Sequence, residues 1–267
     1  MSPHIGSVVS DGQEKGHQMS ETEVRSEQDA VSAEFREDVT VELVRGAASD
    51  GDVVFAARVS TQGDGTLDHL GDDPGRSLGL IRYLMRDRHG SPFEHNSMTF
   101  FVSAPIFVFR EFMRHRIASY NEESGRYREL KPVFYVPAAE RPLVQVGKPG
   151  AYEFIAGTKE QHDLVNAHVR KNSIAAFESY RTLLDAGVAR EIARSVLPLN
   201  LYSSMYVTMN ARSLMNFLSL RVHEPDSTFP SFPQREIEMV ARRMEDHWAA
   251  LMPLTHQAFT ANGRVAP

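Results

Sequence analysis

Arginine, histidine and glutamate are concentrated in one short segment of the chain. Between Arg110 and Arg128 there are five arginines, one histidine and three glutamates. Arg114 and Arg116 are expected at the end of a helix that begins near Pro105, and side chains two positions apart project about 200° apart around a helix axis. One helix end can therefore offer cations to two different ligands.

Ser124-Gly125-Arg126 follows in a polar segment that is predicted to be a loop. Glycine lets consecutive backbone N–H groups turn towards one anion, and Arg126 can then close over a phosphate with two hydrogen bonds. The pattern predicts a phosphate site. The same spacing also fits a solvated loop of salt bridges, so both interpretations stay open on the residues alone.

A second set of polar residues lies in segments that are otherwise apolar. Arg190 and Arg194 share a helix face at i, i+4. Asn210, Arg212, Asn216 and Arg221 lie among Leu214, Met215, Phe217, Leu218 and Leu220. An arginine in such a setting needs either a glutamate partner in the core or an anionic ligand. Both alternatives stay open here too.

Several common kinds of site are disfavoured. His89 and His95 lie close together, but the chain has no cysteine and no HExxH spacing, so no metal site is predicted. Ser124 is not in a GxSxG turn, which argues against a Ser–His–acid hydrolase. Neither GxGxxG nor GxxxxGK[ST] occurs, which disfavours a Rossmann or P-loop nucleotide site.

Composition narrows the class of protein further. The 267 residues suffice for one large domain or two small ones. The absence of cysteine excludes disulfides, iron–sulfur clusters and a thiol nucleophile. A net charge of −6 argues against a general nucleic-acid binder. Of the 29 basic residues, 24 are arginine, which suits planar recognition of phosphate or carboxylate but is also typical of a GC-rich genome.

No membrane span or secretory signal is expected. The longest stretches without acidic or basic side chains, His95–Phe109 and Ser195–Ala211, are shorter than the ~20 residues that a span needs, and both contain proline. The N-terminus has no apolar region behind a basic start. The expected location is the cytoplasm.

Residues 1–38 have no apolar periodicity and are predicted to be a disordered tail, and residues 39–267 are predicted to be the folded domain. Strands are expected at 39–44, 97–103, 132–137 and 199–209. Helices are expected at 50–60, 74–88, 106–116, 158–186, 188–196, 211–222 and 235–259, the last bent at Pro253. Residues 119–128 are predicted to be a loop, and 141–157 a surface excursion. These elements predict a single α/β or α+β domain with a central sheet flanked by helices.

The segment RHRIASYNEESGRY, residues 114–127, resembles the signature of the flavin-dependent thymidylate synthases, an RHR followed by S-x-N-E-x-S-x-R-Y. The resemblance extends to HGSPFEHNSMTFFVSAPIFVFREFMRHR, REIARSVLPLNLY and MNARSLMNFLSLR. It covers roughly residues 39–260.

The resemblance implies a homotetramer with FAD shared between subunits. It implies an enzyme that makes dTMP from dUMP, taking the methylene group of 5,10-methylenetetrahydrofolate and reducing equivalents from NADPH through the flavin. The lack of cysteine agrees with this family, because the unrelated class of thymidylate synthases attacks the uracil ring with a cysteine thiolate.

The resemblance also implies site residues. Those that correspond to FAD contacts are Ser91, Arg114, His115, Arg116, Glu122, Asn210, Arg212 and Asn216. Those that correspond to dUMP contacts are Glu111, Arg114, Glu122, Glu123, Ser124, Gly125, Arg126, Arg194 and Arg221. Arg221 matches the residue thought to stabilise negative charge on the activated uracil, and His89 matches a histidine linked to folate or to gating.

Two departures from the family pattern are visible. Glu111 stands where the family often has glutamine, and a carboxylate beside a phosphate-bearing ligand needs a neutralising cation such as Arg114 or Arg126. The segment after Arg221 is longer than in many relatives, and no role is assigned to His223. The alternatives to the flavoenzyme are an arginine-rich RNA- or polyanion-binding module without catalysis, and an inactive scaffold of the same fold.

Overall fold

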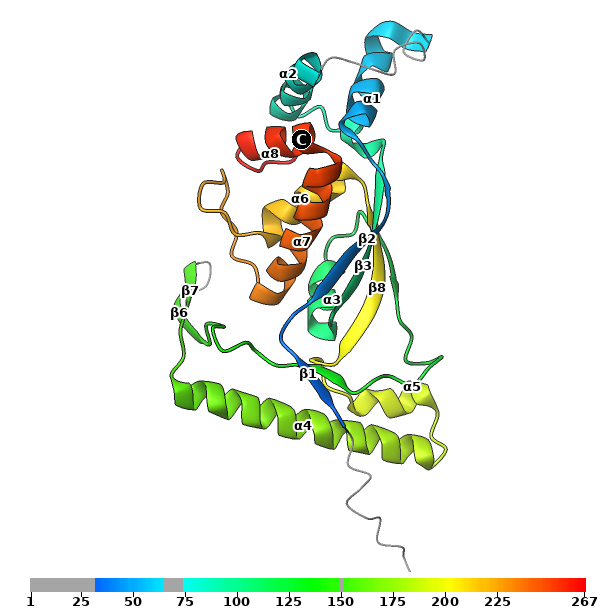
Figure 1. The fold of residues 1–267 in the computed structure, drawn as a ribbon, viewed down its shortest axis with the longest axis vertical. Helices are drawn as coiled ribbons and strands as arrows, with labels where there is room; N and C mark the ends of the chain where they lie inside the picture. The colour runs from blue at the N-terminus through cyan, green and yellow to red at the C-terminus, as the bar shows by residue number, and fades with distance from the viewer. Residues whose placement is uncertain (1–31, 65–73, 149–150) are drawn as a thin grey trace, which may run out of the picture. The chain divides into compact units, whose positions relative to one another are not determined.

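A four-stranded antiparallel sheet forms the centre of the structure (Figure 1). The computed structural model describes residues 32–64, 74–148 and 151–267, and Val31–Pro267 group as one compact unit. In spatial order the strands are β2 (Thr40–Ala47), β3 (Ser97–Pro105), β8 (Tyr202–Met209) and β4 (Ser119–Glu122). Segments more than a hundred residues apart are thus brought side by side.

Fully buried and more exposed residues alternate along the strands, so one face of the sheet packs against the core. Met98, Phe100 and Val102 of β3 are fully buried, whereas Phe101 between them belongs to the opposite face. On that opposite face Phe101 is paired with Tyr206 of β8, their ring centroids are 5.9 Å apart, and Tyr206 is 49% exposed. The sheet therefore buries one side only.

Three helices cover the buried face: α3 (Ile106–Phe112), α6 (Ala211–Arg221) and α7 (Arg235–Leu251) (Figure 1). They fill the main core with Phe109, Phe217 and Trp248. At one end of the sheet lie α1 (Asp50–Gln62), α2 (Pro74–Arg86), the 3-10 helix η3 (Ser91–Glu94) and α8 (Pro253–Ala261). The ends of α3 and α6 carry the residues of greatest chemical interest.

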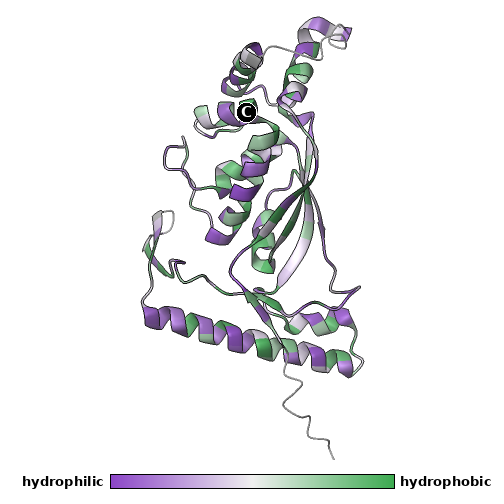
Figure 2. Cartoon of the chain, in the orientation of Figure 1, coloured by the Kyte–Doolittle hydropathy of each residue, from purple (hydrophilic) through white to green (hydrophobic). Residues whose placement is uncertain are grey.

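A smaller core lies between a second pair of strands and a long helix. β1 (Glu34–Arg36) pairs in parallel with β5 (Val133–Tyr135), and Phe134 packs with Phe177 and Tyr180 of α4 (Lys159–Asp185). After α4 come the short helices α5 (Arg190–Ala193) and η4 (Arg194–Val196). Figure 2 shows hydrophilic and hydrophobic residues alternating around α4, as expected for a helix with one packed side.

The mixed single-domain fold is confirmed, but three local predictions are wrong. The predicted tail ends too late, because Glu34–Arg36 form β1; residues 1–31 lie outside the described residues. Ser119–Glu122 form β4 instead of a loop. The surface excursion predicted at 141–157 is confirmed, since none of its described residues is buried, and within it β6 (Val144–Lys148) and β7 (Ala151–Ile155) form a hairpin. The helix from Ile106 ends at Phe112, so Arg114 and Arg116 follow it.

The expected bend at Pro253 is confirmed, since α7 ends at Leu251 and α8 begins at Pro253. The long helix predicted at 158–186 is also confirmed, with a capping box in which Thr158 and Gln161 satisfy each other's backbone N–H groups. Among the described residues, no helix is both long and apolar enough to cross a membrane.

Candidate active site

The first cluster of predicted site residues joins the end of α6 to the end of α3. Arg221 is the last residue of α6, and its Nη1 donates to the Glu111 carboxylate. Its Nε donates to Nε2 of His115 at 3.0 Å, and its Nη2 reaches the carbonyl oxygen of Glu111 at 3.4 Å. Glu111, expected to be neutralised by Arg114 or Arg126, is instead neutralised by Arg221.

His115 is neutral in this arrangement. Burial, together with the charge of Arg221, lowers the pKa of His115 to about 4. The Nε–H of Arg221 can only donate, so Nε2 of His115 must accept and the ring proton must lie on Nδ1. The imidazole packs edge-on against Phe217 with centroids 4.9 Å apart, and Phe217 in turn stacks on Phe112 at 4.8 Å.

Tyr120 of β4 stabilises the turn that follows α3. Its hydroxyl donates to the carbonyl oxygens of Phe112 at 3.0 Å and His115 at 2.7 Å. Arg114 and Arg116 lie in and after this turn, exposed, and within the described residues their side chains have no hydrogen bond or ion pair. The prediction that they project from opposite sides of a helix end is wrong, but both guanidinium groups are available to anions.

The second cluster is the Ser124-Gly125-Arg126 loop with Arg194 from η4. Gly125 is buried, and a Cβ on it would lie 3.0 Å from Leu130 and 3.3 Å from Cδ of Arg194, so the loop backbone and Arg194 are in close contact. The hydroxyl of Ser124 accepts from the backbone N–H of Arg126 at 3.3 Å. A side chain at this position would press on both neighbours, so glycine allows their close approach.

Ion pairs surround this loop. Arg126 pairs with Glu191 of α5 at 3.0 Å, and Arg128 pairs with Glu123 at 3.1 Å. Both side chains of the Arg126–Glu191 pair are about half exposed, at 55% and 52%. Pairs so exposed contribute little to stability. The loop is therefore bordered by exposed salt bridges, as one of the two interpretations of the sequence predicts. Because Arg126 is exposed, a phosphate can still bind there, as the other interpretation predicts.

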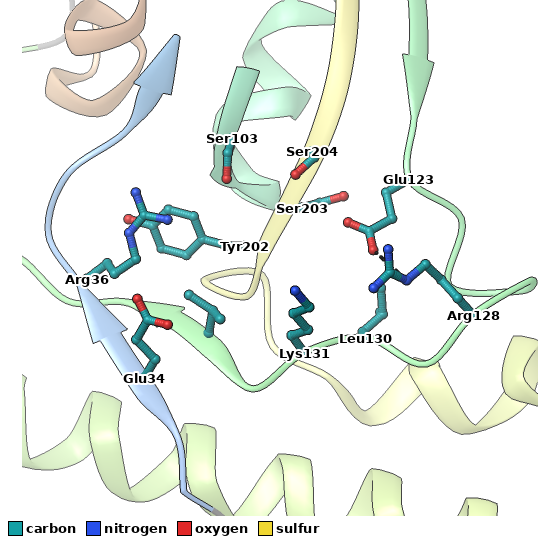
Figure 3. Close-up of a pocket in the computed structure, with 11 residues that line it drawn as sticks. Glu34, Arg36, Ser103, Glu123, Arg128, Leu130, Lys131, Tyr202, Ser203 and Ser204 are labelled. Carbon is teal, nitrogen blue, oxygen red and sulfur yellow. Dashed lines mark ion pairs between the residues drawn. The ribbon is translucent and has the colours of Figure 1, made fainter. Parts of the chain in front are cut away.

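Two cavities open beside this loop. One of about 310 Å³ is lined by Glu123, Arg128, Lys131 and the serines Ser203 and Ser204 among others, and Figure 3 shows their side chains around it. The other, of about 420 Å³, includes Glu122 and Tyr206. Desolvation raises the pKa of Glu122, and the Ser203 hydroxyl and the charge of Arg194 partly oppose that rise.

The third cluster lies where η3 meets the start of α6. Arg212 donates from Nε to the carbonyl oxygen of Pro267 at 2.8 Å and pairs through Nη1 with Glu94. Asn216 donates to the carbonyl oxygen of Arg212 at 3.0 Å. Asn210 caps α6 by accepting from the N–H of Ser213 at 2.9 Å. Ser91 begins η3, next to Gly90, which contacts Arg212.

His89 contacts a different part of the chain from the other predicted residues. It directly precedes Gly90, and its ring packs against Tyr83 of α2 with centroids 5.7 Å apart. Within residues 32–64, 74–148 and 151–267, no group of three or more histidine, aspartate or glutamate side chains is placed to hold a metal ion.

Apart from His89, the structure thus groups the predicted residues into three clusters. No hydrogen bond or ion pair among the described residues joins the Arg221 cluster to the Arg126 cluster. Sequence reasoning missed Glu191, Glu94, Gly90 and Tyr120. For Glu191, its place beside Arg190 in an arginine-rich segment was a usable signal. The contact of Gly90 with Arg212 depends on segments more than a hundred residues apart and had no signal in the sequence.

The fold and these clusters define an α+β protein whose exposed guanidinium groups gather around a glycine loop, as in proteins that bind anionic nucleotides. A family model described as thymidylate synthase complementing protein matches residues 42–254. The chain is 68% identical over 235 residues to a flavin-dependent thymidylate synthase of Streptomyces coelicolor, covering 88% of this chain and 96% of that one. This chain belongs to the flavin-dependent thymidylate synthases.

Other relatives support the same family. A flavin-dependent thymidylate synthase of Tropheryma whipplei is 61% identical over 235 residues, covering 87% of this chain and 97% of that one. The crystal structure of the UMP/dUMP methylase PolB from Streptomyces cacaoi, bound with 5-Br dUMP, superposes with a TM-score of 0.84 at 60% identity. That match covers 88% of this chain and 100% of PolB.

The residues present fit a bound FAD. Its pyrophosphate is an anion, and Arg114 and Arg116 are exposed cations without partners among the described residues. The absent side chain of Gly90 leaves room for the guanidinium of Arg212, which a Cβ at this position would displace. Arg212 and Asn216 lie one turn apart on α6 and present a cation and an amide together.

Proposed function

We propose that this chain makes dTMP from dUMP by reductive methylation, with 5,10-methylenetetrahydrofolate as the carbon donor and NADPH as the reductant of FAD. Two contacts carry the proposal: within the motif of residues 114–127, His115 is bonded to Arg221, and Gly125 lies directly beside Arg194. The relatives reported above are enzymes, so the alternative of an RNA- or polyanion-binding module finds no support among them. We place the enzyme in the cytoplasm.

In this proposal the Arg126 and Arg221 clusters act on different parts of dUMP. The N–H groups of the Ser124-Gly125-Arg126 loop, the guanidinium of Arg126 and that of Arg194 bind the phosphate of dUMP, with Glu122 and Glu123 beside them. Arg221 stabilises negative charge on the uracil ring as it is activated, a task that a fixed cation performs best when charge develops in the transition state.

FAD, when bound, supplies the hydride that completes the methyl group. We propose that Arg114, His115, Arg116 and Arg212 hold its anionic and polar groups, with Ser91, Glu122, Asn210 and Asn216 as further contacts. His115 can donate only from Nδ1, since Nε2 is occupied by Arg221. His89, beside Tyr83, is assigned to folate binding or gating.

We also propose a homotetramer with sites shared between subunits. The Arg221 and Arg126 clusters are both assigned to dUMP, yet no hydrogen bond or ion pair among the described residues joins them within one chain. The face of the sheet that carries Phe101 and Tyr206 is not covered by α3, α6 or α7 (Figure 1). Pairing two chains so that each supplies one cluster to a shared site satisfies both observations, and an assembly of four chains is what the family resemblance implies. Light scattering at micromolar concentration tests it, and a fully active monomer would refute it.

A second substrate is suggested by one of the solved relatives. PolB is a UMP/dUMP methylase, and its structure with 5-Br UMP matches this chain at 59% identity with a TM-score of 0.82. We therefore propose that UMP be assayed beside dUMP as a candidate substrate.

Two measurements test the main proposal. Protein purified without denaturant is expected to bind added FAD and show a flavin absorbance spectrum. It is then expected to release tritium from 5-³H-dUMP only when FAD, NADPH and methylenetetrahydrofolate are all present. Flavin binding without tritium release from either nucleotide would overturn the proposed reaction while leaving the cofactor assignment intact.

A further inference from the structure

Tyr120 connects the central sheet to the turn that follows α3. The residue lies in β4 and pairs with Val207 of β8, so its backbone is held by the sheet. Its ring packs against the main core and meets Phe112 edge-on, with ring centroids 6.4 Å apart. The position of the phenol hydroxyl is therefore set by the sheet and by the core together.

The hydroxyl of Tyr120 binds the turn at two points. It donates to the carbonyl oxygens of Phe112 at 3.0 Å and His115 at 2.7 Å, and one hydroxyl hydrogen can be shared between two acceptors in this way. Among the described residues, no other side chain forms a hydrogen bond with the backbone of residues 112–115. Because Arg114 lies between Phe112 and His115 in the chain, Tyr120 holds the backbone on both sides of it.

The turn has few other restraints. Arg114 lies beyond the last residue of α3, and its N–H reaches the carbonyl oxygen of Glu111 at 3.3 Å, which is long for a hydrogen bond. Without Tyr120, the carbonyl oxygen of His115 would have no partner among the described residues. Burial raises the pKa of Tyr120 to about 12, so its hydroxyl stays protonated and remains a donor at neutral pH.

The direction of the Arg114 side chain depends on this turn. The side chain is exposed and, within the described residues, has no hydrogen bond or ion pair of its own. A long side chain without a partner can adopt many rotamers, and a mobile backbone would add further directions. Fixing the backbone reduces the entropy that Arg114 loses when it binds an anion.

We propose that Tyr120 is a positioning residue: its hydroxyl fixes the turn so that Arg114 is presented to FAD. This inference rests on the proposed function, in which Arg114 holds FAD. Tyr120 itself needs no contact with the flavin, because both of its acceptors are backbone carbonyl oxygens of the turn.

The test is a double-mutant cycle on the full chain with four forms: wild type, Tyr120→Phe, Arg114→Ala and the double variant. Flavin fluorescence titration gives the Kd of FAD without turnover. Tyr120→Phe is expected to raise this Kd by roughly 2- to 12-fold, the effect of one neutral hydrogen bond. In the Arg114→Ala background the same substitution is expected to cause no further rise. At saturating FAD, kcat for tritium release is expected to stay within about twofold of wild type.

Tyr120→Phe is expected to leave the chain folded. The ring remains in place, and the carbonyl oxygen of Phe112 keeps its bond from the N–H of His115 at 2.8 Å. Tyr135→Phe is the matched control, because it also removes one hydroxyl, whose bond to Glu236 at 2.7 Å lies outside the residues assigned to FAD. This control is expected to lower Tm and to keep the Kd of FAD.

Three results would overturn the positioning role of Tyr120. The first is a lower Tm for Tyr120→Phe with an unchanged Kd of FAD, which would make the hydroxyl purely structural. The second is an equal rise in Kd for Tyr135→Phe, which would show general loosening of the fold. The third is losses that add in the double variant, which would show that Tyr120 does not act through Arg114.

The wild-type titration separates this inference from the proposed function. Wild type that binds no FAD refutes the cofactor assignment itself. Wild type that binds FAD, with the same Kd in Tyr120→Phe, refutes only the role of Tyr120.

Discussion

The guanidinium of Arg212 lies directly against the backbone of Gly90. A Cβ on Gly90 would be 2.5 Å from both Cζ and Nε of Arg212, closer than real Cβ atoms come to any other atom. The backbone of Gly90 has φ −75° and ψ −29°, which any residue adopts. Glycine is therefore needed at this position for the space it leaves to Arg212, and not for its conformational freedom.

Replacing Gly90 with alanine is expected to displace Arg212 without unfolding the chain, because the atoms that must move are the far end of a flexible side chain. If Arg212 binds FAD, the Kd of FAD rises by roughly tenfold, as for one charge-assisted hydrogen bond. Flavin fluorescence titration measures it. Gly79→Ala on α2 is the matched control, since a Cβ there meets nothing within 4 Å. Equal FAD affinity in Gly90→Ala and wild type would remove Arg212 from the flavin site.

Arg126→Ala is expected to raise the KM for dUMP by roughly 10- to 150-fold with a smaller effect on kcat, because a charge-assisted bond to phosphate is lost. The ion pair with Glu191 at 3.0 Å supplies a second test. Glu191→Gln removes an anion that competes for Arg126, so dUMP is expected to bind equally well or more tightly. Weaker dUMP binding by Glu191→Gln would indicate that Glu191 orients Arg126 instead of competing with the phosphate.

Ser124→Ala is expected to retain catalysis with a raised KM for dUMP. The Ser124 hydroxyl accepts from the N–H of Arg126 at 3.3 Å, and no histidine or carboxylate contacts it among the described residues. A hydroxyl without an adjacent base is a poor nucleophile. Steady-state kinetics with tritiated dUMP checks this prediction. A variant that binds dUMP and FAD normally yet releases no tritium would make Ser124 a covalent catalyst.

Much of the fold was predictable because helix signals are local. The capping residues of α4 and the proline that begins α8 lie within the segments they define. β4 could not be predicted in this way. Ser119–Glu122 is polar and lacks a buried face of its own, and it becomes a strand only because β8, some eighty residues later, offers backbone partners such as Thr208. The strand β1 likewise depends on pairing with β5.

The residues of the candidate site could be predicted from the sequence, but the ion pairs between them could not. The motif and the apolar setting of Arg221 single out the arginines, and family resemblance assigns their ligands. Which carboxylate pairs with which arginine depends on tertiary packing. Glu111 was expected beside Arg114 or Arg126 and is found on Arg221, because α3 and α6 end next to each other. Such pairings follow from the sheet that places both helices, which no local pattern encodes.

A buried ion pair near the end of the chain predicts how stability depends on pH. Both carboxylate oxygens of Glu245 accept from Arg264, at 2.7 and 2.8 Å, and Nε2 of His256 lies 2.9 Å from Oε1. Burial by itself would raise the pKa of Glu245, but the hydrogen bonds from His256 and Arg264 outweigh it and lower the pKa to about 2. The pair ties α7 to the segment after α8, whose last residue, Pro267, accepts from Arg212.

Because the folded-state pKa of Glu245 lies below its ordinary value of 4.5, the ionised form stabilises the fold fully above that value and progressively less as pH falls towards 2. The stabilisation amounts to ~3 kcal/mol per chain. Glu245→Gln is expected to melt earlier than wild type at pH 7, and the difference in Tm is expected to shrink as pH is lowered through 4.5. Asp163→Asn on exposed α4 is the control, since its pair with Lys159 is largely solvated and should change Tm little. A Tm difference for Glu245→Gln that stays constant from pH 7 to pH 3 would show that packing, and not the charge of Glu245, holds this segment.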